Sequence, residues 1–196
     1  MTAILDATIQ VLIRDGLTRL TTTRVATRAG VSVGTLYQYF ADKRSLVAAV
    51  KQRHLGEIVG VVEQACAMNR GAPLRVMVTS LCHAFIDAKI RRVDESRALY
   101  SAGAEVDGDV LVRAASLRAQ QAIAAMLATA PDATFEDPAV TALMLSTATT
   151  GPVQALLEAG APAPMVALLR THLTELCVGY VERIGGSGAA RSTVGR

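Results

Sequence analysis

Residues 21–43 decide the fold of this chain and read TTTRVATRAGVSVGTLYQYFADK. Thr21 and Thr22 can accept hydrogen bonds from the N–H groups that open a helix, and Gly30 can take the left-handed backbone that ends one. Ser32 is a second capping residue, which starts only about seven further helical residues. Two short helices joined by a tight turn containing glycine form a helix-turn-helix, whose second helix can enter the DNA major groove.

A third helix is expected beside this segment, because short helices are marginal alone and need a partner to pack on. Residues 3–15 supply one apolar stripe, formed by Ile4, Ala7, Val11 and Leu12. Gly16 is predicted to end that helix. Leu36 and Phe40 lie four residues apart and are predicted to anchor the second short helix, and Asp42 is predicted to cap the helix that follows. We therefore expect a DNA-binding domain at residues 1–50, with its helix-turn-helix at about 21–40.

The run from Ile4 to Val50 resembles the N-terminal domain of the tetracycline-repressor (TetR) family of bacterial transcriptional regulators. The resemblance covers about a quarter of the chain and rests on small, capping and aromatic residues in a fixed order. The matching residues are Ile4-Leu-Asp-Ala7, Gly16, Thr21-Thr-Thr-Arg24, Ala26, Ala29-Gly-Val-Ser32, Gly34-Thr-Leu-Tyr37, Tyr39-Phe40, Lys43 and Leu46. The resemblance implies an all-α fold whose remaining part binds an effector and forms a dimer.

Spacing and resemblance together predict the residues that contact DNA. Thr35 and Gln38 lie on the outward face of the second short helix, where glutamine can pair with adenine, and Arg24 can pair with guanine. Gly34 allows a close approach to the groove, and Tyr37 is one of the residues expected to bond phosphates. The full predicted set is Thr22, Arg24, Val33, Gly34, Thr35, Tyr37, Gln38, Tyr39 and Lys43.

Two features depart from the usual family pattern. The chain starts Met1-Thr2-Ala3, so the basic arm that often precedes the first helix is missing or the true start lies upstream. Val33 occupies a position that is often basic or polar, and it favours an apolar contact such as one with a thymine methyl group.

Charge is segregated along the chain. Residues 1–53 hold eight Lys and Arg against three Asp and Glu, a net charge of +5, whereas residues 54–196 hold twelve against fourteen, a net charge of −2. A basic N-terminal segment is the electrostatic signature of phosphate binding, although a solvated basic face is the simpler alternative.

Composition excludes several classes of protein. Three cysteines spaced far apart, Cys66, Cys82 and Cys177, fit a reducing cytoplasm without a disulfide framework. No basic segment followed by an apolar segment opens the chain, so we do not expect secretion. We expect charge to interrupt every apolar run before about 18 residues, so no transmembrane helix and no membrane partner are predicted. Histidines 54, 83 and 172 stand apart from metal-ligand spacing, and neither a phosphate loop nor a catalytic triad is recognisable. We therefore predict no enzyme, no metal and no cofactor.

The rest of the chain is predicted to be helical. Periodicity and helix-breaking residues place helices at 42–68, 74–91, 93–101, 109–129, 138–159 and 165–184, with a kink or break at Gly151-Pro152. Residues 51–184 are assigned to ligand binding and dimerisation, and residues 185–196 to a flexible tail.

An effector pocket is predicted among the helices at 74–91, 109–129 and 138–159. Its candidate lining residues are Phe85, Tyr100, Met126 and Met144. Their apolar character favours a lipophilic effector, and plain core packing is the alternative for each of them. His83 is either a core histidine or a polar group in this pocket.

A dimer surface is predicted on residues 138–184, because the last two helices are apolar on several faces. We expect its centre at Leu156, Leu157, Leu169 and Leu173. The family resemblance favours a four-helix bundle with the symmetry mate, and burial within one protomer is the alternative.

The sequence thus predicts a cytoplasmic, homodimeric transcriptional repressor of a palindromic operator, released by a small molecule. Two alternatives remain open at this point. One is a redox-responsive regulator that senses through Cys66 and Cys82, and the other is a helical ligand-binding protein that has lost DNA binding.

Overall fold

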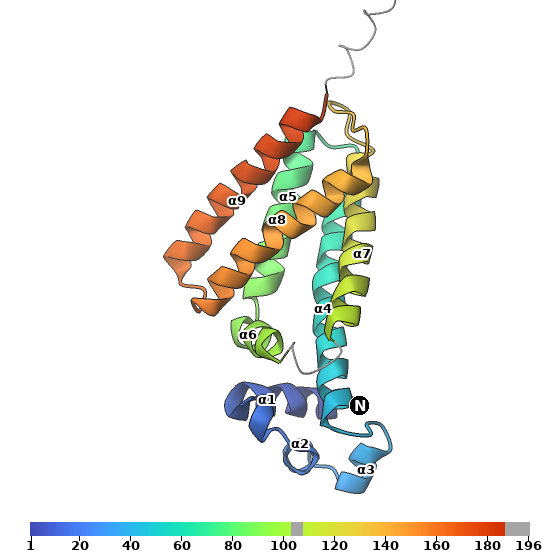
Figure 1. Cartoon of the computed structure of the whole chain (residues 1–196), viewed down its shortest axis with the longest axis vertical. Helices are drawn as coiled ribbons and strands as arrows, with labels where there is room; N and C mark the ends of the chain where they lie inside the picture. Colours follow the sequence, from blue (N-terminus) through green and yellow to red (C-terminus); the bar gives the residue numbers. More distant parts are fainter. Residues whose placement is uncertain (103–107, 187–196) are drawn as a thin grey trace, which may run out of the picture. The chain divides into compact units, whose positions relative to one another are not determined.

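The computed structural model describes residues 1–102 and 108–186, and the secondary structure of these residues is helical apart from one isolated bridge between Thr134 and Gly186. The helices are α1 (Thr2–Arg19), α2 (Thr22–Ala29), α3 (Val33–Tyr37), α4 (Lys43–Met68), α5 (Leu74–Ile90), α6 (Val93–Ser101), α7 (Gly108–Leu127), α8 (Pro138–Glu158) and α9 (Ala163–Ile184) (Figure 1). The predicted all-α class is confirmed.

The helices form two compact units. The first comprises Met1–Glu57 and Arg92–Ala114, and the second comprises Ile58–Arg91 and Ala115–Arg196. Helix α6 therefore belongs with the N-terminal helices, where it packs against α1. The assignment of residues 1–50 and 51–184 to separate functions stays a prediction.

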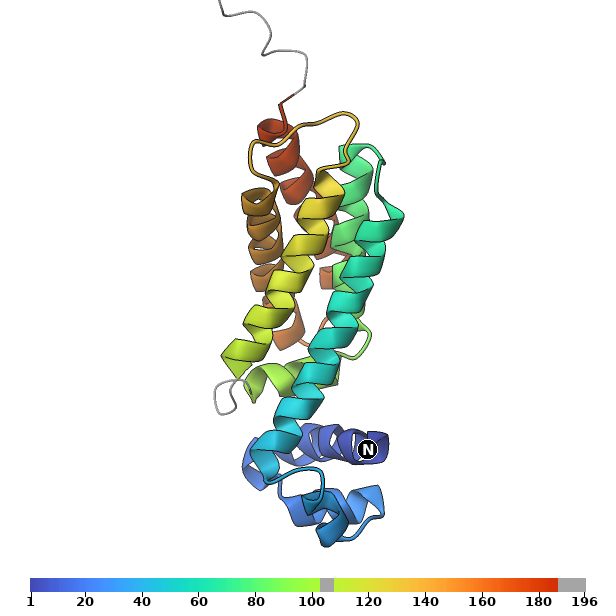
Figure 2. The ribbon, with the colours of Figure 1, turned by 90° about the vertical axis from the view of Figure 1, so that its right-hand side faces the viewer.

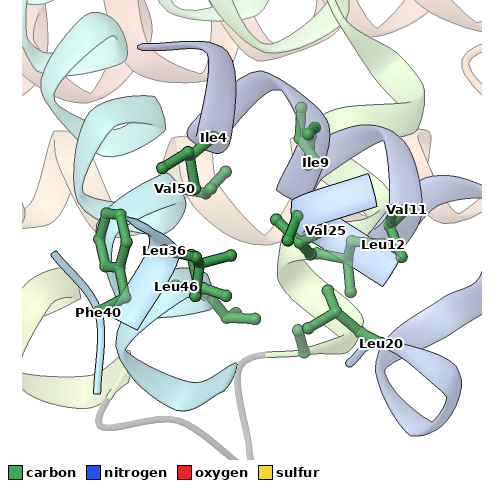
Figure 3. Packing of buried hydrophobic residues seen from close by; sticks show 14 of the residues in the cluster. Ile4, Ile9, Val11, Leu12, Leu20, Val25, Leu36, Phe40, Leu46 and Val50 are labelled. Atoms are coloured by element: carbon green, nitrogen blue, oxygen red, sulfur yellow. The ribbon is translucent and has the colours of Figure 1, made fainter. Parts of the chain in front are cut away.

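The first unit is built on a small aliphatic core. Residues from α1 to α4 converge there, and Leu20, Val25, Leu36 and Leu46 are completely shielded from solvent (Figure 3). Helix α1 is interrupted at Gly16, which has φ 74° and ψ 170°, before the chain continues to Arg19. Gly16 thus breaks the helix where we predicted, because a positive φ favours a residue without a Cβ.

Helix α3 is shorter than the sequence suggested, with five residues instead of about seven. The chain continues as a turn, in which the N–H groups of Tyr39 and Phe40 both donate to the Leu36 carbonyl at 3.1 and 3.0 Å. This turn carries Phe40 into the core and leads to α4, which Asp42 caps as expected.

The second unit contains α5, α8 and α9, which pack against one another, together with the C-terminal parts of α4 and α7 (Figure 1). Figure 2 shows those parts of α4 and α7 side by side, and an ion pair of 2.8 Å joins Glu63 to Arg118 between them. The other helical segments predicted in this region agree with the structure to within a few residues.

We predicted a kink or a break at Gly151-Pro152, and the break is wrong, because α8 runs through both residues as one helix. A proline removes one backbone hydrogen bond. The side chains that follow it, Val153, Leu156 and Leu157, are all buried. Their packing within the unit outweighs the local preference for a break.

Helix α8 also corrects the expectation about charge. Residues 138–157 contain no charged side chain, and α8 is long and apolar enough to cross a membrane by length and composition alone. A helix in the core of a helical domain passes the same test, and α8 buries one face against α5 and α9.

The predicted flexible tail at 185–196 falls almost wholly outside the described residues. Its first two residues are hydrogen-bonded, since the N–H of Gly185 donates to the Val181 carbonyl and the Thr134 side chain donates to the Gly186 carbonyl.

Candidate nucleic-acid interface

The turn between α2 and α3 is fixed by local hydrogen bonds. Gly30 adopts φ 69° and ψ 29°, its N–H donates to the Thr27 carbonyl, and the N–H of Val31 donates to the Ala26 carbonyl. This pair of bonds is a Schellman motif, which satisfies the last carbonyls of a helix and turns the chain sharply. The predicted glycine-containing turn is confirmed.

Both short helices have side-chain caps at their N-termini. The Thr21 hydroxyl accepts from the Arg24 N–H at 3.3 Å, and the Ser32 hydroxyl accepts from the Thr35 N–H at 2.9 Å. Because each cap satisfies a backbone donor that would otherwise lack an intrahelical partner, the two helix starts are defined by sequence.

Helix α3 is anchored from one side and exposed on the other. Leu36 lies in the core, and Val33 packs partly against it (Figure 3). Tyr37 and Tyr39 are 53% and 57% exposed, and Gln38 is also exposed. Their exposure leaves the polar ends of these side chains accessible to a groove or a phosphate.

The two smaller polar positions differ from this pattern. Gly34 is exposed, and a Cβ built there would meet only the Ser32 side chain at 3.7 Å, so the protein itself does not require glycine. Thr35 is half-buried, and its hydroxyl lies 2.8 Å from the Ser32 hydroxyl. A hydroxyl has more than one hydrogen-bonding site, so Thr35 can still bond a base edge.

The structure brings together two residues that sequence spacing alone did not connect. The hydroxyls of Thr22 and Tyr37 lie 3.2 Å apart, although they are fifteen positions apart in the chain. This contact ties the start of α2 to the end of α3 and places two predicted DNA-binding hydroxyls side by side.

Arg24 has partners within the first unit that the sequence did not reveal. Its guanidinium donates to the Arg19 carbonyl at 3.1 Å and lies 3.6 Å from a carboxylate oxygen of Asp15. A hydrogen bond from Arg14 lowers the pKa of Asp15, so this carboxylate is ionised at neutral pH. Arg24 is half-exposed, and exposed ion pairs are weak, so a DNA acceptor can replace the contact with Asp15.

Lys43 is exposed at the first position of α4. The N–H of Ser45 donates to the Asp42 carboxylate at 2.8 Å, and the N–H of Asp42 donates back to the Ser45 hydroxyl at 3.2 Å. The hydrogen bond from the Ser45 N–H lowers the pKa of the Asp42 carboxyl and keeps it ionised. The reciprocal cap holds Lys43 at a helix N-terminus, where the helix dipole also favours an anion such as phosphate.

The four predicted pocket residues do not all lie in one unit. Phe85 is half-buried on α5, Met126 is buried on α7 and Met144 is exposed on α8, all in the second unit, whereas Tyr100 is on α6 in the first. Their role in ligand binding stays a prediction.

Sequence reasoning missed Lys89, which is only 6% exposed and places its ammonium 5.6 Å from the ring centre of Phe85. Burial lowers the pKa of Lys89 to about 8. A signal was available, because Lys89 lies four residues after Phe85 on the apolar face of α5.

The predicted centre of the dimer surface is wrong for three of its four residues. Leu156, Leu157 and Leu173 are buried within the protomer, and Leu169 is half-buried. A helix that is apolar on several faces does not reveal which face meets its own protein. The large apolar side chains exposed on α8 and α9 are Val140, Leu143, Met144, Met165, Leu168, Leu176 and Ile184.

Comparison with known proteins gives a consistent result. The family model "Bacterial regulatory proteins, tetR family" matches residues 4–50, and the model "Tetracyclin repressor-like, C-terminal domain" matches residues 73–180. The HTH-type transcriptional regulator YvkB of Bacillus subtilis (strain 168), itself uncharacterized, is 36% identical over 61 residues, which are 31% of this chain and 32% of that protein. The match thus spans about a third of the length of this curated relative.

Solved structures show the same fold at low identity. A structure from Mesorhizobium loti MAFF303099, assigned to the TetR family of transcriptional regulators, has a TM-score of 0.76 and 19% identity, covering 94% of this chain and 96% of that one. The fatty acid degradation regulator FadR of Bacillus halodurans has a TM-score of 0.72 and 16% identity, covering 90% and 93%. FadR of Bacillus subtilis in complex with stearoyl-CoA has a TM-score of 0.69 and 15% identity, covering 90% and 97%.

Proposed function

The chain belongs to the tetR family of bacterial transcriptional regulators, and we propose that it is a cytoplasmic, homodimeric repressor that binds a palindromic operator and is released by a small lipophilic effector. As a member of this family, it is a regulator with a DNA-binding helix-turn-helix domain and a ligand-binding C-terminal domain, and it is not an enzyme.

The arrangement of α3 supports the DNA-binding part of this proposal most strongly. Leu36 fixes the helix to the core while Tyr37, Gln38 and Tyr39 remain exposed. A helix held in this way can be inserted into a major groove without loss of internal packing. Gln38 then reads a base, and the tyrosines and Lys43 bond the flanking phosphates.

The shortness of α3 supports a dimer. Five helical residues offer too few base contacts for specific binding at ordinary salt. A dimer carries two DNA-binding domains and so gains the missing affinity, because the second binding event becomes intramolecular. In a two-fold dimer the recognition helices meet successive major grooves about 34–36 Å apart, which makes the operator a palindrome.

The exposed apolar side chains of α8 and α9 support a location for the dimer contact. Leu143 and Met144 lie on α8, and Met165, Leu168 and Leu176 lie on α9. The exposed part of α8 carries no charge until Glu158. An uncharged helical face of this kind commonly marks a protein interface.

The effector is proposed to be lipophilic because the inner faces of α5 and α8 are apolar, and because the related FadR of Bacillus subtilis was solved with stearoyl-CoA. For release to follow binding, the effector must prefer the state that does not fit the operator, since equal affinity for both states shifts nothing.

Selection from a random pool of duplex DNA with the purified protein tests the proposal. Enrichment of a palindrome whose complex dissociates when stearoyl-CoA is added would support both the operator and the effector. A palindrome that stays bound when stearoyl-CoA is added would rule out stearoyl-CoA as the effector and leave the proposal of DNA binding intact. Failure to enrich any sequence would contradict the proposal and favour the alternative in which the protein binds ligand but no longer binds DNA.

A further inference from the structure

Two ion pairs show how α5 and α9 are aligned within the second unit. Arg75 pairs with Glu182 at 3.1 Å, and Asp87 pairs with Arg170. The twelve positions from Arg75 to Asp87 match the twelve positions from Glu182 back to Arg170, so the two helices are antiparallel and in step over this length.

Cys82 and Cys177 face each other inside this register. Cys82 lies seven positions after Arg75, and Cys177 lies five positions before Glu182, an offset of two positions between the helices. Both side chains are buried, with 0% and 1% exposed, and each thiol shifts the pKa of the other, as neighbouring groups do.

The separation implied by helix geometry suits a disulfide. Packed helices have axes about 8–10 Å apart and Cα atoms about 2.3 Å from each axis, and two residues rise about 3 Å. Two facing residues with this offset therefore have Cα atoms about 4.5–6 Å apart, within the range of about 4.4–6.8 Å that disulfides require.

The two thiols are not chemically equivalent. The S–H of Cys82 stabilises the Cys177 thiolate and lowers the pKa of Cys177, whereas the interaction with Cys177 and burial raise the pKa of Cys82. The third cysteine differs from both, since burial raises the pKa of Cys66 on α4 to about 11 and leaves it a poor nucleophile.

We propose that Cys82 and Cys177 are a modification site, at which a two-electron oxidant such as hydrogen peroxide forms a disulfide joining α5 to α9. The Cys177 thiolate attacks one peroxide oxygen, the O–O bond breaks, and hydroxide leaves and takes up a proton to give water and a sulfenic acid. The Cys82 sulfur then attacks the Cys177 sulfur, and the S–O bond breaks with loss of a second water. Two thiols are oxidised by two electrons, and one peroxide is reduced to two waters.

This pairing differs from the redox alternative drawn from the sequence, which named Cys66 and Cys82. Because both thiols of the pair are buried, oxidation requires a transient opening between α5 and α9 and is slower than oxidation of an exposed thiol. Once formed, the disulfide holds α5, which carries Phe85 and Lys89, against α9, which carries exposed Leu168. The modification is independent of the proposed operator and effector.

Thiol mapping on the full chain tests the proposal. The protein is incubated with hydrogen peroxide at a temperature just below its unfolding transition. It is then denatured in the presence of N-ethylmaleimide, which alkylates the remaining free thiols, and digested without reductant for mass spectrometry. We expect a linked pair of peptides carrying Cys82 and Cys177, loss of two of the three free thiols, and recovery of all three after reduction. Circular dichroism before and after oxidation reports that the helices persist.

Two variants make the outcome decisive. Cys66→Ala should still lose two thiols and give the same linked peptide, and Cys177→Ala should give no linked peptide within the chain. Three alkylated cysteines after prolonged oxidation would overturn the proposal. A disulfide through Cys66, or separate over-oxidation of Cys82 and Cys177, would overturn it equally.

Discussion

Replacing Leu168 with alanine removes an exposed apolar side chain from the proposed dimer surface on α9. Leu168 is 59% exposed in the protomer, and burial of a whole leucine side chain is worth about 1.5–3 kcal/mol. The exposed part is therefore worth about 0.9–1.8 kcal/mol in each subunit. Since a two-fold interface contains each residue twice, the dimer should lose about 1.8–3.6 kcal/mol, which raises its dissociation constant roughly 20- to 400-fold.

A matched control is available on α7, where Leu117 is 57% exposed. Leu117→Ala removes the same atoms from a different helix and should leave the dissociation constant within about threefold of the wild type. Sedimentation velocity over nanomolar to micromolar concentrations measures all three proteins. A large effect of Leu117→Ala with none for Leu168→Ala would refute the placement of the interface on α8 and α9.

Three further predictions concern single side chains. Lys43→Ala should lower the slope of log affinity against log salt concentration by about 0.9 per subunit without changing sequence preference. The control is Arg70→Ala, which changes an exposed arginine in the second unit and should leave the slope intact. An unaltered slope for Lys43→Ala would show that this residue does not contact phosphate. Gln38→Ala should relax specificity at one base pair in each half-site by about 1–3 kcal/mol, measured by repeating the DNA selection, and an unchanged consensus would remove Gln38 from base readout. Lys89→Met should stabilise the protein at neutral pH. The pKa of Lys89 is about 8 in the folded state and 10.5 in the unfolded state, so the charged side chain opposes folding below pH 8. This penalty fades as the pH rises from 8 to 10.5. Chemical denaturation should show the advantage of the methionine variant shrinking by about 2–3 kcal/mol from pH 7 to pH 10, and an advantage independent of pH would contradict the shift.

The N-terminal motif could be predicted from sequence because its signals are local. Thr21 and Ser32 cap helices through bonds to residues three positions away, and Gly30 supplies a backbone conformation that its neighbours do not influence. Such interactions depend on residue type and spacing alone. They fixed the ends of α2 and the start of α3 without knowledge of the rest of the chain.

Features that depend on packing between helices were predicted less well. Leu156 and Leu173 share a periodic apolar pattern with exposed neighbours, and the period cannot tell which face of α8 or α9 meets its own unit. Pro152 carries a strong local signal for a break, which the burial of the residues after it overrides. Tertiary context decides both cases.

The candidate site shows the same division. Tyr37 is exposed at the end of α3, whereas Gln38 and Tyr39 are exposed in the turn that follows, where we had predicted a longer helix. The contact between Thr22 and Tyr37 and the pairing of Arg24 with Asp15 depend on how α1, α2 and α3 pack, so sequence spacing gave no sign of them.

The most direct test of the central claim compares the affinity of the purified protein for a complete selected palindrome and for one isolated half-site, by fluorescence anisotropy, with the stoichiometry of each complex measured by sedimentation. We predict two chains on each palindrome and an affinity for the half-site at least about 100-fold weaker, because the second DNA-binding domain binds intramolecularly only on the complete site. A single chain that binds the half-site as tightly as the palindrome would contradict the account.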